Sequence, residues 1–172
     1  RRLNFYNAGF LRQRQLRRIL SLASYKLCIG RPKAKHAVVV WGHSQTAYRG
    51  QWVTQKQGAS LIRIEDAFLR FVRTGRDGDP PLGLVLDSTG CHFDASKPSD
   101  LEHMLQHHPL DDPHLIERAT AATRRIQHSH LSKYNTFEPT TAPSVTDYVL
   151  VIDQTFNDAA LRTSGANAAQ FH

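Results

Sequence analysis

The chain has 172 residues, 40% of them hydrophobic and 22% charged, which is the composition of an ordinary globular protein of one domain and a little more. No apolar run approaches the roughly 18 residues of a membrane span, and the basic start lacks the apolar core of a signal peptide. Two cysteines without CxxC or zinc spacing indicate reduced thiols, so we expect a cytoplasmic protein.

Basic residues are concentrated in the first part of the chain. Residues 1–64 contain thirteen Lys or Arg and no Asp or Glu, whereas residues 65–172 contain nine bases and fifteen acids. Such a basic half favours an anionic partner, which is a phosphate, an acidic sugar, a membrane surface or a nucleic acid. Because no RNA-binding fingerprint accompanies the charge, we expect no nucleic acid; a solvated helix face is the simpler alternative.

The first predicted element in chain order is a basic amphipathic helix over residues 10–27, followed by a Pro-containing link. Its apolar residues recur at close to helical spacing, with arginines between them. Such a helix can lie on anionic lipid or pack on a protein core, and the pattern leaves both open. Residues 1–35 are therefore predicted to form a basic N-terminal helix and link.

A Rossmann-like domain is predicted over residues 36–135. It begins with a buried strand at 37–42, continues with a helix that Ser44 caps and Gly58 ends, and returns in a strand at 60–64. This strand–helix–strand unit suits a right-handed βαβ crossover.

The second part of this domain contains a third strand at residues 82–86 and two helices. Ser99 and Glu102 form a capping box that starts the first helix, and Pro113 starts a longer helix that ends near residue 131. We expect an α/β fold for this part of the chain.

A linker rich in Thr and Pro is predicted over residues 136–146. A new buried strand is expected at residues 148–152, so residues 147–172 are predicted to be only the start of a second domain.

Acidic residues follow two of the predicted strands. Glu65 and Asp66 come directly after the strand at 60–64, and Asp153 and Asp158 follow the strand at 148–152. Ligands of open α/β sheets bind at the carboxyl ends of strands, where carboxylates act as bases, nucleophiles or metal ligands. Each site can equally be a helix N-cap.

Several stretches in fixed order and spacing resemble the capsule polysaccharide biosynthesis family of retaining β-Kdo transferases, Kdo being an acidic sugar. The stretches that carry the resemblance are Val40–Gly42, Arg63–Arg70, Pro80–Asp87, Pro98–Glu102, Lys133–Asn135 and Asp153–Ala159.

The resemblance covers about residues 36–165 and implies a GT-B glycosyltransferase, in which two Rossmann-like domains face each other across a cleft. It implies that 36–135 is the acceptor-side domain and that 147–172 begins the donor-side domain. It implies CMP-Kdo as the donor, a lipid-linked acidic-sugar acceptor at the cytoplasmic membrane face, and neither metal nor cofactor. We therefore expect a role in capsule biosynthesis, peripheral location on the inner membrane, and no transfer by this chain alone.

The family pattern also implies roles for individual residues. The family's acidic pair matches Glu65 and Asp66, although Ala67 stands where the family has glycine. If that position requires a positive φ, the backbone of Ala67 would be strained. If the glycine instead allows a ligand to come close, the methyl group of Ala67 would narrow the site. A later stretch of the family matches Gln154 and Asp158, with Ala160 in place of serine.

The implied chemistry uses the carboxylates in two roles. Asp158 is the expected nucleophile, Glu65 or Asp66 the expected base that deprotonates the acceptor, and Arg63 or Arg70 the expected partner of the acceptor carboxylate. Gln154 is expected to bind substrate. The alternative is a non-catalytic domain that binds acidic sugars or lipid head groups.

Overall fold

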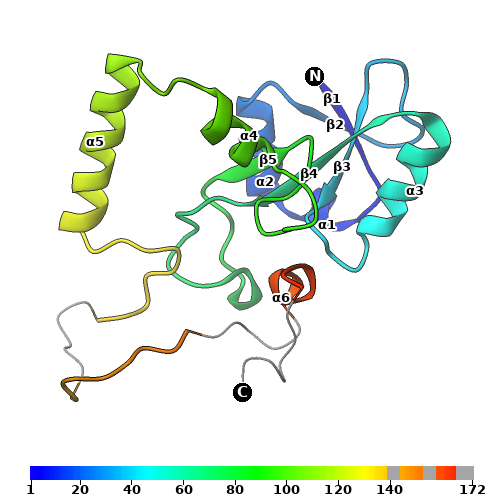
Figure 1. Ribbon diagram of the computed structural model, residues 1–172. Coiled ribbons are helices and arrows are strands. Elements are labelled where there is room, and N and C mark those ends of the chain that lie inside the picture. The colour runs from blue at the N-terminus through cyan, green and yellow to red at the C-terminus, as the bar shows by residue number, and fades with distance from the viewer. Residues whose placement is uncertain (139–143, 153–157, 166–172) are drawn as a thin grey trace.

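Figure 1 shows the computed structural model, which describes residues 1–138, 144–152 and 158–165. Within these ranges the elements in chain order are β1 Arg2–Phe5, α1 Gly9–Arg12, α2 Arg14–Leu22, β2 Lys26–Cys28, β3 Ala37–Trp41, α3 Ala47–Gln57, β4 Ser60–Asp66, a 3-10 turn Gly75–Asp77, β5 Leu84–Asp87, α4 Asp100–His107, α5 Pro113–His128 and α6 Ala159–Thr163.

The described strands form one sheet of five in the order β2-β1-β3-β4-β5. The first four run parallel, and β5 runs antiparallel to β4, which confirms the expected α/β class. The chain leaves β1 through α1 and α2 to reach β2 on one side, whereas β3 and β4 follow on the other side. The carboxyl ends of β1 and β3 therefore form a topological switch point, where ligands of such sheets bind.

The core lies between the sheet and α2. Alternate strand residues face this helix, as expected from the two-residue period of a strand. The buried cluster consists of Leu3, Phe5, Phe10, Leu16, Leu20, Val39 and Ile64. On the opposite face, Val38 and Val40 pack under α3, and Gly50 of that helix lets the two layers approach closely.

The N-terminal segment differs from the single helix expected over residues 10–27. The helix is interrupted at Gln13, whose backbone is extended, and it ends before Ser24, which has a φ of 62°. Residues 26–28 then form β2 instead of another helical turn. Because β1 and β2 pair within the sheet, the first 35 residues contribute strands as well as helix, and α2 packs on the protein core.

Most of the other expected elements are confirmed, with shifted ends. The βαβ unit is present as β3, α3 and β4, and α3 ends at Gly58 with a φ of 61°. Ser99 and Glu102 form the predicted capping box, and Pro113 starts α5. The expected cap of α3 by Ser44 is wrong, because Thr46 occupies the cap position and makes no side-chain cap bond.

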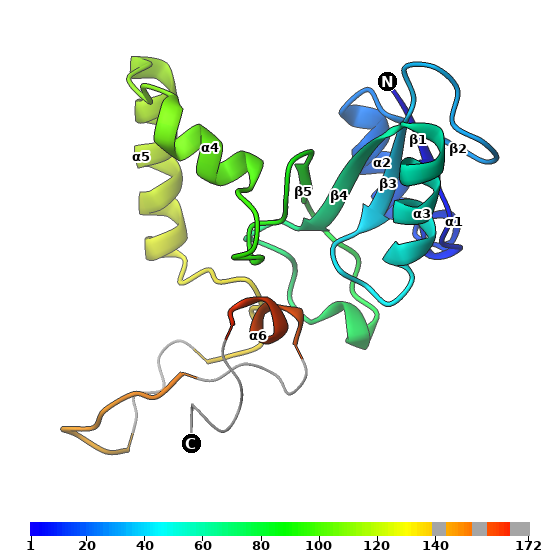
Figure 2. The same ribbon diagram turned by 45° about the vertical axis from the view of Figure 1, so that its right-hand side comes forward.

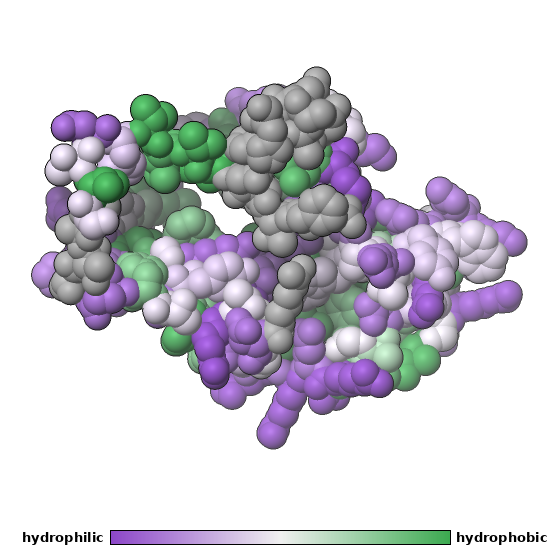
Figure 3. Space-filling view, turned by 90° about the horizontal axis from the view of Figure 1, so that it is seen from below, coloured by the Kyte–Doolittle hydropathy of each residue, from purple (hydrophilic) through white to green (hydrophobic). Residues whose placement is uncertain are grey.

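The strand expected at residues 148–152 is not formed. Its five residues are all exposed, Val149 to 90%, and no strand of the described residues pairs with them. An extended segment without a partner leaves its backbone groups to water, so apolar sequence does not produce a strand there. Exposed apolar surface is visible in Figure 3, and Figure 2 shows α4 and α5 standing away from the sheet.

We expect Gly50→Ala to destabilise the domain although alanine favours helices. A Cβ at this position would lie 2.4 Å from Cγ1 of Val40 and 3.1 Å from Cγ1 of Val38, so α3 must shift away from β3. Overpacking of this kind costs about 1–3 kcal/mol, which exceeds the helix-propensity gain of about 1 kcal/mol. Urea unfolding measures the difference, with exposed Gln55→Ala on the same helix as the control. Equal stability of the two variants would contradict the close packing.

Candidate functional site

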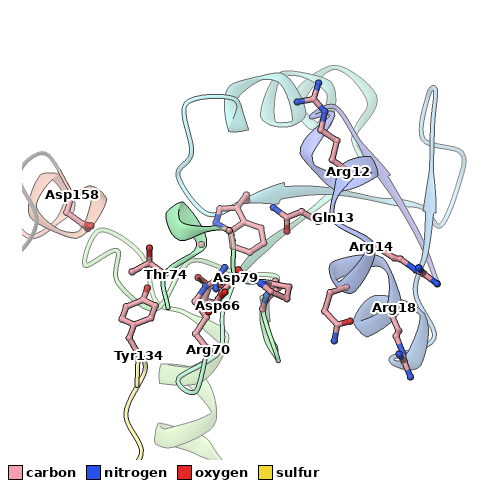
Figure 4. Close-up of a pocket in the computed structure, with 16 residues that line it drawn as sticks. Arg12, Gln13, Arg14, Arg18, Asp66, Arg70, Thr74, Asp79, Tyr134 and Asp158 are labelled. Carbon is pink, nitrogen blue, oxygen red and sulfur yellow. Dashed lines mark hydrogen bonds and ion pairs between the residues drawn. The ribbon is translucent and has the colours of Figure 1, made fainter. Parts of the chain in front are cut away.

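A cleft of about 1580 Å³ opens at the switch point of the sheet. One wall comes from the corner between α1 and α2, which carries Arg12 and Gln13 (Figure 4). Trp41 at the end of β3 also lines the cleft. Asp66 at the end of β4 and Asp158 at the start of α6 lie on the other side. Segments more than ninety residues apart in the chain therefore bring two of the predicted carboxylates to one cleft.

The two acids of the predicted pair lie on opposite faces of the sheet. We expected β4 to end at Ile64, but it continues to Asp66, so the strand alternation includes both acids. Asp66 lies on the same face as Ile64, toward α2 and the cleft, whereas Glu65 lies on the face of Gly42. The pair therefore provides two carboxylates in different surroundings rather than one shared site.

Asp66 is held by an ion pair inside the protein. Its Oδ2 accepts a hydrogen bond from Nε of Arg70 at 2.7 Å, and Arg70 is only 6% exposed. Nη1 of Arg70 also donates to the carbonyl oxygen of Asp79 at 2.8 Å. Oδ1 of Asp66 is buried and has no hydrogen-bond partner among the described residues. Arg70 thus fixes the orientation of Asp66 and leaves its second carboxylate oxygen buried and without a partner among the described residues.

Glu65 is the carboxyl group with the most perturbed proton affinity. Burial, and then the neighbouring charge of Asp66, raise the pKa of Glu65 to about 7, while Lys133 opposes the shift and Asp158 adds to it. The carboxyl group sits directly over Gly42, in the space that a Cβ at that position would occupy. Gly42 therefore provides the room for Glu65. A carboxyl group with a pKa near 7 suits general base catalysis.

Asp158 begins α6 as its N-cap, and Oδ1 accepts a hydrogen bond from the backbone N–H of Ala160 at 2.8 Å. The helix is attached to the loop after β5, because Oγ1 of Thr163 donates to the carbonyl oxygen of Phe93 at 3.0 Å. Asp158 is therefore a helix N-cap, which was one of the two expectations for this residue, and it also lines the cleft. Its charge reaches Glu65, as the raised pKa of Glu65 indicates.

The stretch Lys133–Asn135 is a part of the site that the sequence did not assign. Tyr134 forms a parallel bridge with Phe71, and Nδ2 of Asn135 donates to the Phe71 carbonyl at 3.1 Å. These bonds bring Tyr134 into the cleft and Lys133 close enough to lower the pKa of Glu65. The sequence could have pointed to this stretch, because it is one of those that carry the family resemblance, but no functional role was assigned to it.

Arg63 lies in a different place from Arg70. Nη1 of Arg63 donates to the carbonyl oxygen of Gly42 at 2.7 Å, and Arg63 lines a second pocket of about 430 Å³. His43 and Asp94 line the same pocket, and Nε2 of His43 lies 2.9 Å from Oδ2 of Asp94, a contact that becomes an ion pair only when His43 is protonated. Burial, and then Arg63, lower the pKa of His43. Gln154 lies outside the described residues.

Ala67 adopts no positive φ, so the absence of the family glycine causes no backbone strain there. Its methyl group packs toward Gly83, whose carbonyl oxygen accepts from the Ala67 backbone N–H at 3.3 Å. Both cysteines of the described chain are free thiols. Within the described ranges, no three His, Cys, Asp or Glu residues come together as metal ligands, and no helix has the length and apolar character to cross a bilayer.

The sheet order and the cleft at its switch point define a Rossmann-like domain of a GT-B-like glycosyltransferase fold, and a solved structure supports this class. The chain superposes on the β-Kdo 2,4 transferase of Thermosulfurimonas dismutans KpsC with a TM-score of 0.86 and 30% identity, over 98% of this chain and 53% of that one. The KpsC β-Kdo 2,7 transferase shares the fold at a TM-score of 0.61 and 22% identity.

The family follows from the sequence comparison. The model of the capsule polysaccharide biosynthesis protein family matches residues 36–138, and the chain belongs to this family. It is 34% identical to the capsule polysaccharide modification protein LipA of Neisseria meningitidis serogroup A, over 81% of this chain and 21% of LipA. It is 35% identical to the lipopolysaccharide-processing protein LpsZ of Rhizobium meliloti, over 73% of this chain and 29% of LpsZ.

These relatives are much longer than the chain described here. The chain spans between a fifth and a third of the curated proteins and about half of the solved transferase chains.

We expect Glu65→Gln to become more stable relative to the parent chain as the pH rises. The folded pKa of Glu65, about 7, exceeds the ordinary value of 4.5, so the folded state holds the proton more tightly. Stability from this group is present below pH 4.5 and is lost as the pH rises through 7. The substituted amide would stay neutral throughout, so the variant should gain on the order of 2 kcal/mol between pH 5 and pH 8.

Urea unfolding of both chains at each pH measures this gain. Glu117→Gln on the exposed surface of α5 is the control, because it removes the same charge without burial. A parallel pH dependence of the parent chain and Glu65→Gln would show that Glu65 is ionised in the folded protein at pH 5.

Proposed function

We propose that the protein containing this chain is a retaining glycosyltransferase of capsule polysaccharide biosynthesis, which moves Kdo from CMP-Kdo to a lipid-linked acidic-sugar acceptor. The observation that carries the proposal is that Asp158 lines the switch-point cleft together with Asp66, and that its charge also acts on Glu65 at the same end of β4. The similarity to a solved β-Kdo transferase over 98% of the chain supports the donor sugar.

In the first step, a carboxylate oxygen of Asp158 attacks the anomeric carbon of Kdo. The bond from that carbon to the phosphate oxygen breaks, and CMP leaves with the electron pair. The product is a Kdo ester of Asp158 with inverted configuration. Asp158 lies in the cleft opposite the wall formed by α1 and α2 (Figure 4), and we expect the acceptor to approach the anomeric carbon from the side of that wall.

In the second step, the acceptor hydroxyl attacks the same carbon and the ester bond to Asp158 breaks. The hydroxyl proton passes to a carboxylate, and two inversions restore the original configuration. Glu65 suits this role better than Asp66, because the pKa of Glu65 is about 7 and none of the described residues forms an ion pair with it. Asp66 forms an ion pair with Arg70, and we assign it a positioning role instead.

The remaining parts of the proposal concern the whole protein. We propose that residues 36–135 belong to the acceptor side, that residues 136–146 link the domains, and that residues 147–172 begin the donor side. A cytoplasmic enzyme working peripherally at the inner membrane, without metal or cofactor, fits this assignment. Arg63 and Gln154 are proposed substrate contacts, whereas Arg70 acts through Asp66.

Intact-protein mass spectrometry of the full-length protein, after exposure to CMP-Kdo without acceptor, tests the roles. We expect a Kdo-sized adduct on the parent and on Glu65→Gln, and none on Asp158→Asn. Glu65→Gln should then transfer Kdo to the acceptor about 10²–10⁴-fold more slowly than the parent, because a positioned base contributes that much.

Asp147→Asn is the matched control, since Asp147 is exposed and does not line the cleft. An adduct that persists on Asp158→Asn would reject Asp158 as the nucleophile. Binding of acidic sugar without any transfer by the full-length parent would favour the non-catalytic binding domain.

A further inference from the structure

The cleft has a basic wall that the proposed transfer step does not use. Arg12 of α1 and Arg14 and Arg18 of α2 line the cleft on the side away from Asp158 (Figure 4). All three are exposed, and no acid among the described residues forms an ion pair with them. The fourth cleft arginine, Arg70, is already paired with Asp66. The three unpaired charges are therefore available to a ligand.

The break between α1 and α2 produces this arrangement. The extended backbone of Gln13 turns the chain at the cleft, so Arg12 and Arg14 leave the two helices on either side of it. Arg18 lies one helical turn beyond Arg14, on the same side of α2. Leu16 and Leu20 of that helix are 1% exposed and anchor it to the sheet, so the basic wall stands on a rigid element.

We propose that this wall, formed by Arg12, Arg14 and Arg18, binds the carboxylates of an acidic sugar chain at residues beyond the reacting one. The inference rests on the proposed transfer reaction, because it places the acceptor hydroxyl near Glu65 and Asp158. In Figure 4 the Arg14 and Arg18 side chains extend away from Asp66, which suits a chain that crosses the cleft and leaves it there. Gln13 and Gln15 line the same wall and offer amide groups to sugar hydroxyls.

The position of the arginines favours an acidic sugar chain, rather than a membrane surface, as the ligand of this wall. A flat bilayer reaches outward-facing cations, such as those of an amphipathic helix lying on lipid. Arg14 and Arg18 instead border a cleft, which a narrow polymer enters and a bilayer does not. Arg17 lies between them in the sequence, is equally exposed and does not line the cleft, so the same helix provides a comparison for both ligands.

The test compares two charge-matched double variants of the full-length protein. Arg14→Gln with Arg18→Gln removes two charges from the wall, and Arg17→Gln with Lys26→Gln removes two exposed charges elsewhere in the same segment. The probe is a fluorescent Kdo trisaccharide, measured by anisotropy, and a fluorescent Kdo monosaccharide is measured beside it. Vesicles of equal parts phosphatidylglycerol and phosphatidylcholine form the lipid arm, and thermal unfolding confirms that both variants fold.

We expect the wall variant to bind the trisaccharide about tenfold more weakly and the control variant to change binding less than twofold. The monosaccharide should bind equally to all three proteins. In transfer assays the wall variant should raise KM for the trisaccharide acceptor and leave kcat unchanged, since the arginines do not touch the reacting atoms.

Equal loss of trisaccharide binding in both double variants, or no loss in either, would overturn the proposal. Loss of vesicle binding by the wall variant, with trisaccharide binding unchanged, would assign the arginines to lipid and overturn it as well. If the full-length protein transfers no Kdo but the wall variant still loses trisaccharide binding, the proposed reaction fails and the basic wall stands. If transfer proceeds and KM is unchanged in the wall variant, the reaction stands and the basic wall fails.

Discussion

The site depends on one buried arginine, because Arg70 connects four segments that are separate in the sequence. Its side chain binds Asp66 at the end of β4 and the carbonyl of Asp79 in the loop beyond the 3-10 turn. Its backbone accepts from Leu82, which precedes β5, and donates to Lys133, which follows α5. Removing one partner of a buried ion pair costs about 3–5 kcal/mol, so the Arg70 side chain contributes strongly to holding Asp66 in its orientation. The backbone of the same residue adds the bonds to Leu82 and Lys133.

The alternation of β4 then separates the chemistry of two neighbouring carboxylates. Asp66 lines the cleft, and one of its oxygens accepts a hydrogen bond from Arg70. Glu65 points to the other face, over Gly42, where burial and the Asp66 charge raise its pKa to about 7. Two adjacent acids in such different surroundings can take separate roles in one reaction. A glycine at position 42 is a condition for this, because any side chain there would displace Glu65.

The sequence predicted the local parts of the fold and missed those that depend on distant partners. The βαβ unit and the Ser99 capping box follow from periodicity and cap chemistry within about twenty residues, and both are present. β1 and β2 are short, and the apolar residues of β2 also fit the helical spacing of the preceding arginine-rich segment. The positive φ of Ser24, which ends that segment, gives no composition signal. The segment 148–152 has the composition of a strand but finds no partner among the described residues.

The residues of the site were partly predictable for the same reason. Acids at strand ends and a family pattern pointed to Glu65, Asp66 and Asp158. Because β4 was expected to end at Ile64, the sequence did not show that Glu65 and Asp66 lie on opposite faces of the strand. The uneven distribution of basic and acidic residues could be counted in the sequence, but its position in space is known only from the fold. The arginines of α1 and α2, in the basic first part of the chain, form one wall of the cleft, and Asp66 and Asp158 lie across it. Opposite charges that are separated along the chain thus line one cavity. Both proposals depend on this arrangement, the transfer step on the acidic side and the anionic chain on the basic wall.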